Sequence, residues 1–388
     1  MDISYIINEL GEERENYFNA IAPPIVQTSN FAFKTVADLR KAFEEEYSVY
    51  LYSRGMNPTV EILRKKLAAL DGAEDCLVLN SGAAAIYIAV MANVKTGDHV
   101  ISVQKPYAAA QKLFDEIFPK FGISISYVDG TDIANFENAI QPNTTLIYLE
   151  SPNSYSFLLQ DLEAVGKLAK AKNITTIIDN SYCTPLYQQP ILLGIDISLQ
   201  SATKYISGHS DVIAGVITGT KAMMKKIFKT EYMTIGSGIQ PFNAWLLIRG
   251  LRTLPMRIAH ITKTTKTVVH YLNNHPKVEK VFFPFDEKFP QYELAKKQMK
   301  YACGLVTFIV KAKSAKEIEQ FCEALKHILM AVSWGGYESL IIPKCAGFPH
   351  SEFDATNEEH KMIRLYVGQE EAEYIIADLE RGFKVLSI

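Results

Sequence analysis

Short apolar runs alternate with stretches of helical period through the middle of the chain. The helical stretches begin at Ala83, near Gln111 and at Leu162. This alternation is typical of βαβ units, in which helices connect the parallel strands of one sheet. The expected strands are Cys76–Leu79, Val100–Val103, Ile123–Val128, Thr145–Leu149 and Ile174–Ile178, and further strands at Ile197–Gln200 and Val212–Thr218 extend the same sheet.

The segment before the first strand divides into two parts. Residues 1–55 mix polar runs, aromatic clusters and the pair Pro23-Pro24 without a sustained period, so we expect an arm that packs on something else. A helix follows, because Asn57-Pro58 is a typical helix start, apolar residues then recur at helical spacing, and Asp71-Gly72 is a typical end.

The C-terminal part has a different pattern. A long helical stretch at Trp245–Asn273 precedes a strand at Leu305–Val310, a helix from Ala315 to His327, a strand at Ile363–Val367 and a closing helix from Glu370. This order predicts a smaller α+β domain, with the boundary near Gly250. The expected organisation is an arm at 1–55 that contacts a neighbouring subunit, an α/β domain at 56–250 and an α+β domain at 251–388.

Composition limits the class of protein. A chain of 388 residues with 48% hydrophobic and 21% charged residues suits two packed globular domains. A net charge of -3 provides no basic field, so we expect no nucleic-acid partner. The longest apolar stretch, Ala83–Ala92, is too short to span a membrane, and the N-terminus lacks a leader pattern, so we expect a cytoplasmic protein that does not engage membranes.

Cysteine and histidine spacing indicates neither a metal site nor a disulfide framework. The five cysteines form no Cys-x-x-Cys pair, and the eight histidines form no His-x-x-x-His pair. We therefore expect reduced cysteines that lie mostly in the core.

Polar residues follow three of the expected strands. Asn80-Ser81-Gly82-Ala83 leads from a strand into a helix, where free backbone N–H groups can bind phosphate. Asp179 ends another strand, and Ser201-Ala202-Thr203-Lys204 follows a third. Taken singly, Ser81 is most simply a helix cap, Asp179 a strand cap and the segment 201–204 an exposed basic loop. Together they supply the three parts of a pyridoxal phosphate site, namely a lysine for the Schiff base, an acid for the pyridine nitrogen and donors for the phosphate.

Further motifs extend this pattern along the chain. In order, they are Tyr52-Ser53-Arg54, Asn80-Ser81-Gly82, Glu150-Ser151-Pro152, Asp179-Asn180, Ser201-Ala202-Thr203-Lys204-Tyr205, Gly208-His209-Ser210-Asp211, Arg249-Gly250-Leu251-Arg252-Thr253-Leu254 and Ser333-Trp334-Gly335-Gly336-Tyr337-Glu338-Ser339-Leu340. The set resembles the Cys/Met metabolism pyridoxal-phosphate enzymes, which include the cystathionine lyases and synthases and methionine γ-lyase. The resemblance implies a fold-type I, aspartate aminotransferase-like α/β enzyme.

The resemblance also implies a role for individual residues. Lys204 would be the Schiff-base lysine and proton shuttle, Asp179 would pair with the pyridinium, and Tyr107 would stack on the cofactor ring and act as a base. Tyr52 and Arg54 resemble the pair that reaches the phosphate of a neighbouring subunit, which implies active-site-sharing dimers within a homotetramer. The cofactor would thus be bound by Tyr52, Arg54, Gly82, Ala83, Tyr107, Asp179, Ser201, Thr203 and Lys204, and the substrate by Ser154, Ser333, Trp334 and Arg364.

Arg364 would bind the substrate carboxylate, since a guanidinium offers two parallel donors. The substrate class is a small sulfur-containing amino acid. Trp334 and Ser154 are typical of the bacterial cystathionine β-lyases, which favours β-elimination of cystathionine to homocysteine, pyruvate and ammonia.

Other segments point towards different members of the same family. Pro241-Phe242-Asn243-Ala244-Trp245 is more typical of the γ-synthases and γ-lyases, and Ala108-Ala109-Ala110 departs from the family pattern beside Tyr107. A γ-lyase, a γ-synthase or a methionine γ-lyase is therefore the nearest alternative. An inactive cofactor-binding regulatory protein is the alternative from another class.

Overall fold

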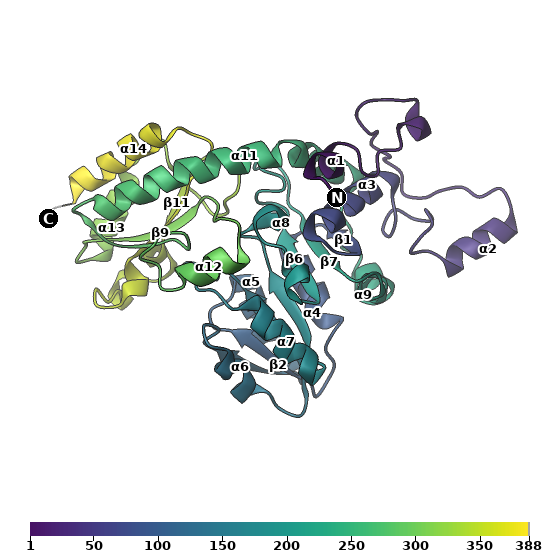
Figure 1. Cartoon of the computed structure of the whole chain (residues 1–388), viewed down its shortest axis with the longest axis horizontal. Coiled ribbons are helices and arrows are strands. Elements are labelled where there is room, and N and C mark those ends of the chain that lie inside the picture. The colour runs from purple at the N-terminus through teal and green to yellow at the C-terminus, as the bar shows by residue number, and fades with distance from the viewer. Residues whose placement is uncertain (387–388) are drawn as a thin grey trace.

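The computed structural model describes residues 1–386, which fold around two β-sheets that are joined by one long helix (Figure 1). The larger sheet has seven strands in the order β1-β7-β6-β5-β4-β2-β3. All neighbouring pairs are parallel except those of β7, which runs antiparallel to β1 and β6. The strands are β1 (Asp75–Leu79), β2 (His99–Val103), β3 (Ser124–Val128), β4 (Thr144–Glu150), β5 (Thr175–Asp179), β6 (Ile197–Ser201) and β7 (Gly215–Gly219).

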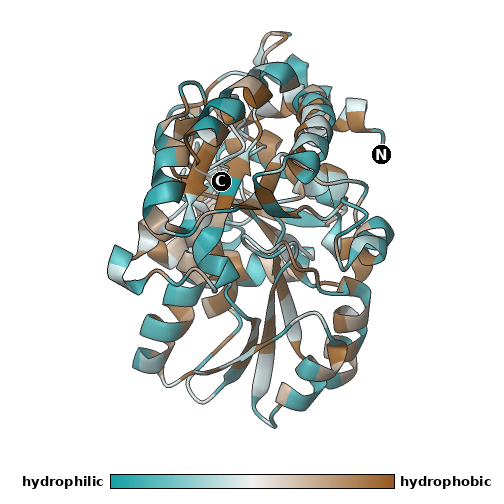
Figure 2. Ribbon diagram, turned by 90° about the vertical axis from the view of Figure 1, so that its left-hand side faces the viewer, coloured by the Kyte–Doolittle hydropathy of each residue, from teal (hydrophilic) through white to brown (hydrophobic). Residues whose placement is uncertain are grey.

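All seven strands of this sheet lie where the sequence pattern predicts them, and only one boundary differs from the prediction by more than one residue. Strand β7 begins at Gly215 rather than Val212, because the chain between β6 and β7 forms an irregular turn that contains Lys204. The strands are apolar and the outer helices carry polar faces (Figure 2).

Helices cover both faces of the large sheet, and their ends follow the expected capping chemistry. The Asn57 side chain accepts a hydrogen bond from Thr59 N–H, and Gly72 ends the same helix with φ +69°. These helices are α3 (Pro58–Asp71), α4 (Gly82–Met91), α5 (Ala108–Lys112), α6 (Ile133–Ala139), α7 (Leu162–Lys172), α8 (Thr184–Tyr187), α9 (Lys221–Ile227) and α10 (Met233–Ile235).

The smaller sheet has five strands in the order β10-β11-β12-β9-β8. Helix α13 ends at Glu323, not at His327 as the pattern predicts. The N–H groups of residues 326–328 donate to the Asp378 carboxylate instead of continuing the helix. The closing helix begins at Ala372. The elements are β8 (Val278–Phe282), α12 (Tyr292–Gln298), β9 (Leu305–Val310), α13 (Ala315–Glu323), β10 (Leu329–Met330), β11 (Leu340–Pro343), β12 (Met362–Tyr366) and α14 (Ala372–Val385).

Helix α11 (Pro241–Asn274) connects the two sheets and is 34 residues long. The boundary expected near Gly250 lies inside this helix, which continues past Pro255 without interruption. Across residues 1–386, no helical segment combines the length and the apolar character that a bilayer-spanning helix needs.

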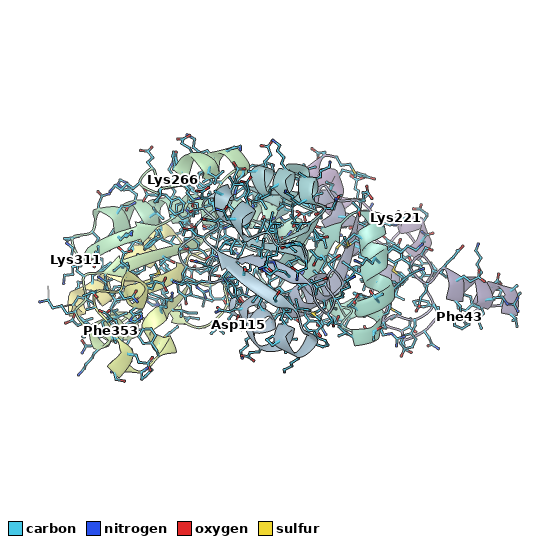
Figure 3. All side chains as sticks on the ribbon, turned by 90° about the horizontal axis from the view of Figure 1, so that it is seen from below. Phe43, Asp115, Lys221, Lys266, Lys311 and Phe353 are labelled. Carbon is cyan, nitrogen blue, oxygen red and sulfur yellow. The ribbon has the colours of Figure 1, made fainter. Side chains whose placement is uncertain are left out.

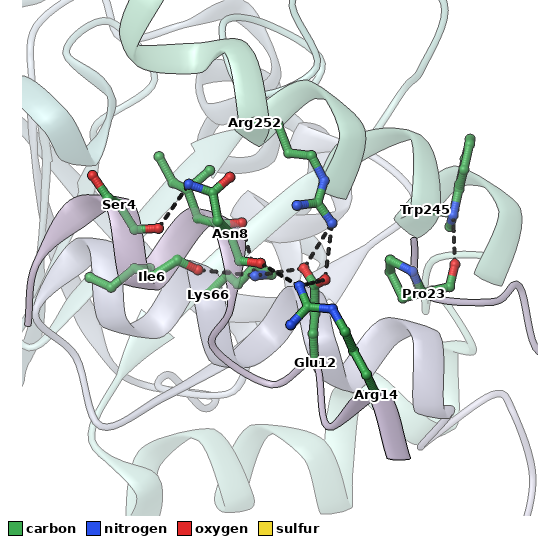
Figure 4. A network of polar contacts seen from close by, with 10 residues as sticks. Ser4, Ile6, Asn8, Glu12, Arg14, Pro23, Lys66, Trp245 and Arg252 are labelled. Carbon is green, nitrogen blue, oxygen red and sulfur yellow. Dashed lines mark hydrogen bonds and ion pairs between the residues drawn. The ribbon is translucent and has the colours of Figure 1, made fainter. Parts of the chain in front are cut away.

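The first part of the N-terminal segment packs on its own chain. Helix α1 (Ile3–Asn8) is attached through Lys66, whose ammonium group contacts the Glu12 carboxylate at 2.9 Å and the carbonyl oxygens of Ile6 and Ile7 (Figure 4). Arg252 of α11 also contacts Glu12 at 2.9 Å. A buried ion pair therefore joins the N-terminus to α3 and α11.

The second part extends away from the body. Helix α2 (Val36–Glu44) lies at the end of this extension and carries Phe43 (Figures 1 and 3). The Phe43 side chain is 65% exposed and Val36 is 72% exposed. Ala42 is the one residue of this helix that is buried within the described chain.

Candidate active site

Lys204 lies in the turn after β6, where the large sheet meets the small domain. Its amine donates a hydrogen bond to Ser333 Oγ at 2.5 Å and lies 5.4 Å from the centre of the Trp334 ring. Burial and the nearby Arg364 cation lower the pKa of Lys204 to about 8, although the Asp179 carboxylate opposes this shift. A lowered pKa increases the neutral, nucleophilic fraction of the amine near neutral pH.

The loop at 333–336 reaches Lys204 because one of its residues is glycine. Gly335 has φ +89°, and a Cβ atom there would lie 2.7 Å from the Cα atom of Lys204. The loop therefore lies directly on the lysine backbone, and it holds Ser333 and Trp334 beside the amine.

Asp179 is the last residue of β5 and is paired in register with Glu150, the last residue of β4. Burial raises the pKa of Asp179, although hydrogen bonds from Ser181 and the Lys204 cation oppose the shift. Burial also raises the pKa of Glu150, and the charge of Asp179 adds to that effect. The two strand ends thus place a pair of buried carboxyl groups under the site.

Glu150 organises the residues around Tyr107. It accepts hydrogen bonds from the Tyr107 N–H at 2.5 Å, from the Ser154 N–H at 2.7 Å and from the Ser154 hydroxyl at 2.6 Å. The Ser154 donor is thus already used within the chain. The Tyr107 side chain is 52% exposed and stands at the start of α5. Glu150 was not assigned a role from the sequence. Its position at the end of a strand, like that of Asp179, could have indicated one.

A cradle for an anion lies at the start of α4. Ser81 caps this helix, since its hydroxyl accepts a hydrogen bond from Ala84 N–H at 3.1 Å. The N–H groups of Gly82 and Ala83 lie in the first turn, where backbone N–H groups have no partner within the helix. A Cβ atom at Gly82 would lie 2.9 Å from Ser201 Oγ, so these groups meet at one point. The Thr203 hydroxyl, in contrast, donates to Ala214 C=O and accepts from Ala214 N–H.

Arg364 lies in the middle of β12 and faces the same region. Its guanidinium donates to Ser333 C=O at 3.2 Å and lies 5.5 Å from the centre of the Tyr155 ring. Burial lowers the pKa of Arg364. Tyr155 was not assigned a role from the sequence, because its position depends on a turn with φ +61° that has no apolar pattern.

Tyr52 and Arg54 lie apart from these residues, at the base of the N-terminal extension. The Arg54 guanidinium is 5.1 Å from the Tyr52 ring, and its side chain packs near Gly236. Within residues 1–386 we find no hydrogen bond from either residue to Lys204 or Ser201. Their expected reach into a neighbouring subunit stays a prediction.

The residues present fit pyridoxal phosphate. Lys204 offers an amine of lowered pKa, and Asp179 offers a buried carboxyl group at a strand end. The cradle at Gly82 and Ser201 has the free N–H and hydroxyl groups that a phosphate requires. The five cysteines are all buried, and none of them forms a disulfide bond.

Comparisons with known proteins agree with this geometry. Residues 5–384 match the family model of the Cys/Met metabolism PLP-dependent enzymes. The L-methionine gamma-lyase of Treponema denticola is 37% identical over 380 residues, covering 96% of this chain and 94% of that protein. The cystathionine gamma-lyase of Macaca fascicularis is 33% identical over 380 residues, covering 97% and 92%.

A solved structure supports the same assignment. The crystal structure of metB from Corynebacterium glutamicum superposes with a TM-score of 0.91 at 31% identity, covering 100% of this chain and 99% of that chain. The likeness confirms the expected fold-type I architecture and, with the family model, the pyridoxal phosphate cofactor. The chain belongs to the Cys/Met metabolism PLP-dependent enzyme family.

Proposed function

We propose that the protein is a carbon–sulfur lyase that eliminates a thiol from the γ-carbon of a sulfur amino acid and releases 2-oxobutyrate and ammonia. The observation that carries this proposal is its identity of 36–38% to five proteins named L-methionine gamma-lyase. The β-elimination favoured by Trp334 and Ser154 has no such support among these relatives, and the γ alternative replaces it as the leading function.

Substrate binding is the task of Arg364 in this proposal. Its planar guanidinium can bind the α-carboxylate with two parallel hydrogen bonds. It is largely buried near Lys204, so the carboxylate would be held in a site from which water is mostly excluded. The α-carbon would then lie close to the Lys204 amine.

Proton transfer is the task of Lys204 and Tyr107. Pyridoxal phosphate, when bound, supplies an electron sink that acidifies the α-hydrogen of the substrate. A γ-elimination requires a proton to leave the α-carbon and a second proton to leave the β-carbon. The Lys204 amine, with its pKa near 8, can accept and return protons near neutral pH. The exposed Tyr107 hydroxyl is the second candidate base.

Two carboxyl groups support these residues from below. Asp179 would pair with the ring nitrogen of the cofactor and keep it protonated. Glu150 fixes the backbone of Tyr107 at the start of α5, and it holds Ser154 at the same time. Glu150 therefore acts through Tyr107 as a positioning residue.

β-Elimination is the second candidate, because one observation favours it. The Trp334 indole lies 5.4 Å from the Lys204 amine and packs edge-on against Tyr205, so it takes up space where a longer substrate chain would bend. Ser154 favours β-elimination less than Trp334 does, because the Ser154 hydroxyl donates to the Glu150 carboxylate.

The products from one substrate separate the two reactions. We expect the purified holoenzyme to convert L-cystathionine to 2-oxobutyrate, cysteine and ammonia, measured by chromatography of the keto acid. Pyruvate with homocysteine would instead establish β-elimination. The Lys204→Ala variant is the control and should release neither keto acid. Failure of the unmodified holoenzyme to release any keto acid from cystathionine, methionine or cysteine would contradict the lyase proposal.

A further inference from the structure

Three charged side chains form a cluster at the junction of the two domains. Lys105 belongs to the large domain and precedes Tyr107 by two residues, whereas Lys344 and Glu359 belong to the small domain. The Lys344 amine donates to a Glu359 carboxylate oxygen at 2.9 Å, and the Lys105 amine contacts the other oxygen. We call these three residues the rim cluster.

The rim cluster is connected to the substrate site through one aromatic ring. The Lys344 amine lies 5.3 Å from the centre of the Tyr155 ring, and the Arg364 guanidinium lies 5.5 Å from the same centre. Lys344 directly follows β11, which pairs with the β12 strand that carries Arg364. Arg364 at the substrate site and Lys344 in the rim cluster therefore lie beside the same aromatic ring.

The charge of the rim cluster is not balanced. Two ammonium groups share one carboxylate, which leaves an excess of one positive charge. Neighbouring ion pairs on the same segment are one-to-one, since Lys280 contacts Glu358 and Lys361 contacts Glu279. The Lys344 amine has three N–H donors, and its one carboxylate hydrogen bond within residues 1–386 uses one of them. Its side chain is 30% exposed, so an anion from solution can approach it.

We propose that the rim cluster binds a carboxylate at the far end of the substrate, so that the enzyme prefers sulfur amino acids with a charged distal end over those that end in a methyl group. The preference rests on the proposed lyase function. Lys344 would contact the incoming carboxylate, and Lys105 would add a second positive charge. Glu359 holds the two lysines in place while the site is free and competes with the substrate for them.

Binding can be measured without turnover by using two amino acids that lack a leaving group. L-2-Aminopimelate has a distal carboxylate. L-Norleucine has the same side chain up to the carbon that carries this carboxylate, and it ends there in a methyl group. Each is titrated into the holoenzyme, and the change in cofactor absorbance gives the dissociation constant. We expect the Lys344→Met variant to lose about tenfold in affinity for aminopimelate, as for one partly buried charged hydrogen bond. Its affinity for norleucine should stay unchanged.

Two further variants separate substrate binding from a purely structural role. Lys280→Met removes an ion pair on the same segment, outside the rim cluster, and should leave both affinities unchanged. Glu359→Gln removes the competing carboxylate and should strengthen aminopimelate binding. If the cluster only holds the domains together, Glu359→Gln and Lys344→Met would each lower the affinity for both ligands. That result, or an unchanged aminopimelate affinity in Lys344→Met, would overturn the proposal.

The outcome is distinguishable from a failure of the lyase proposal. Affinities for aminopimelate and norleucine do not depend on any elimination, so the preference can be measured even if no keto acid forms. The opposite outcome is also clear. If the holoenzyme releases 2-oxobutyrate but Lys344→Met binds both ligands with unchanged affinity, the lyase proposal is supported and the rim cluster is rejected as a specificity site.

Discussion

The proton affinity of Lys204 is set by three surroundings that act in different directions. Burial disfavours the charged amine, and the Arg364 cation disfavours it further, whereas the Asp179 carboxylate favours it. The first two effects exceed the third, so the pKa falls to about 8 from an ordinary value of 10.5. A neutral amine is the form that can attack a carbonyl carbon.

The rate of cofactor attachment to the cofactor-free protein should therefore follow the neutral fraction of Lys204. We expect the rate to rise with pH and to reach half of its maximum near pH 8, because deprotonation is half complete at the pKa. In Arg364→Gln a repelling cation is lost, so the midpoint should move to higher pH. Stopped-flow absorbance after mixing with pyridoxal phosphate measures the rate.

The exposed Arg40→Gln variant on α2 is the matched control for a lost positive charge, and its midpoint should equal that of the unmodified protein. An Arg364→Gln midpoint that stays the same or moves to lower pH would contradict this account of the lysine.

At the scale of elements, the sequence predicts best what is buried on both sides or capped at both ends. Strands such as β1, β2 and β4 are almost wholly buried and largely apolar, and α3 has Asn57 and Gly72 at its ends. Strand β8 (Val278–Phe282) was missed because it lies at a sheet edge and none of its five residues is fully buried. Helix α2 was missed although Thr35 caps its start and its apolar residues recur at helical spacing.

The candidate site likewise has one part that the sequence predicts and one part that it does not. Asp179, Ser201 and Lys204 follow buried strands, so their meeting could be predicted from the alternation of strands and helices. Glu150 contacts Tyr107 across 43 positions of sequence, and Tyr155 reaches Arg364 through a turn. Such contacts depend on how separate loops fold back, which no local period encodes.

The buried ion pair of the N-terminal element should be more important for stability than its exposed neighbour. The side chains of Lys66 and Glu12 are both fully buried, so Lys66→Met removes the buried cation and leaves Glu12 with the partly exposed Arg252. The expected cost is about 3 kcal/mol of unfolding free energy. Lys65→Met is the matched control. Its contacts with Glu61 and Glu13 are partly exposed, and the expected cost is about 0–1 kcal/mol. Urea unfolding followed by circular dichroism measures both, and equal costs would contradict the importance of burial.

At the scale of the whole molecule, the N-terminal extension has the character of an interface without its partner. Phe18 and Ile21 are 101% and 80% exposed, and Phe43 is 65% exposed. Apolar side chains gathered on a projecting segment favour contact with another protein surface. The base of the same extension carries Tyr52 and Arg54, whose expected role is in a neighbouring subunit. These features favour the contact with a neighbouring subunit that the sequence resemblance implies.

The Phe43→Glu variant should therefore shift the protein to a smaller assembly, because a charge would be buried at the subunit contact. Sedimentation velocity at several protein concentrations measures the change. Phe121→Glu is the matched control, since Phe121 is 46% exposed on the large domain and away from α2. Equal sedimentation of all three proteins would exclude α2 from the interface.

The continuity of α11 makes the distance between the domains sensitive to chain length. An α-helix turns by about 100° and rises by about 1.5 Å with each residue. One residue inserted within α11 would thus rotate the small domain around the helix axis and carry Ser333 and Arg364 away from Lys204. Surface loops absorb insertions, but a helix shared by two domains transmits them. We therefore expect relatives with intact activity to vary in length in their surface loops and to keep the length of the segment between Pro241 and Asn274.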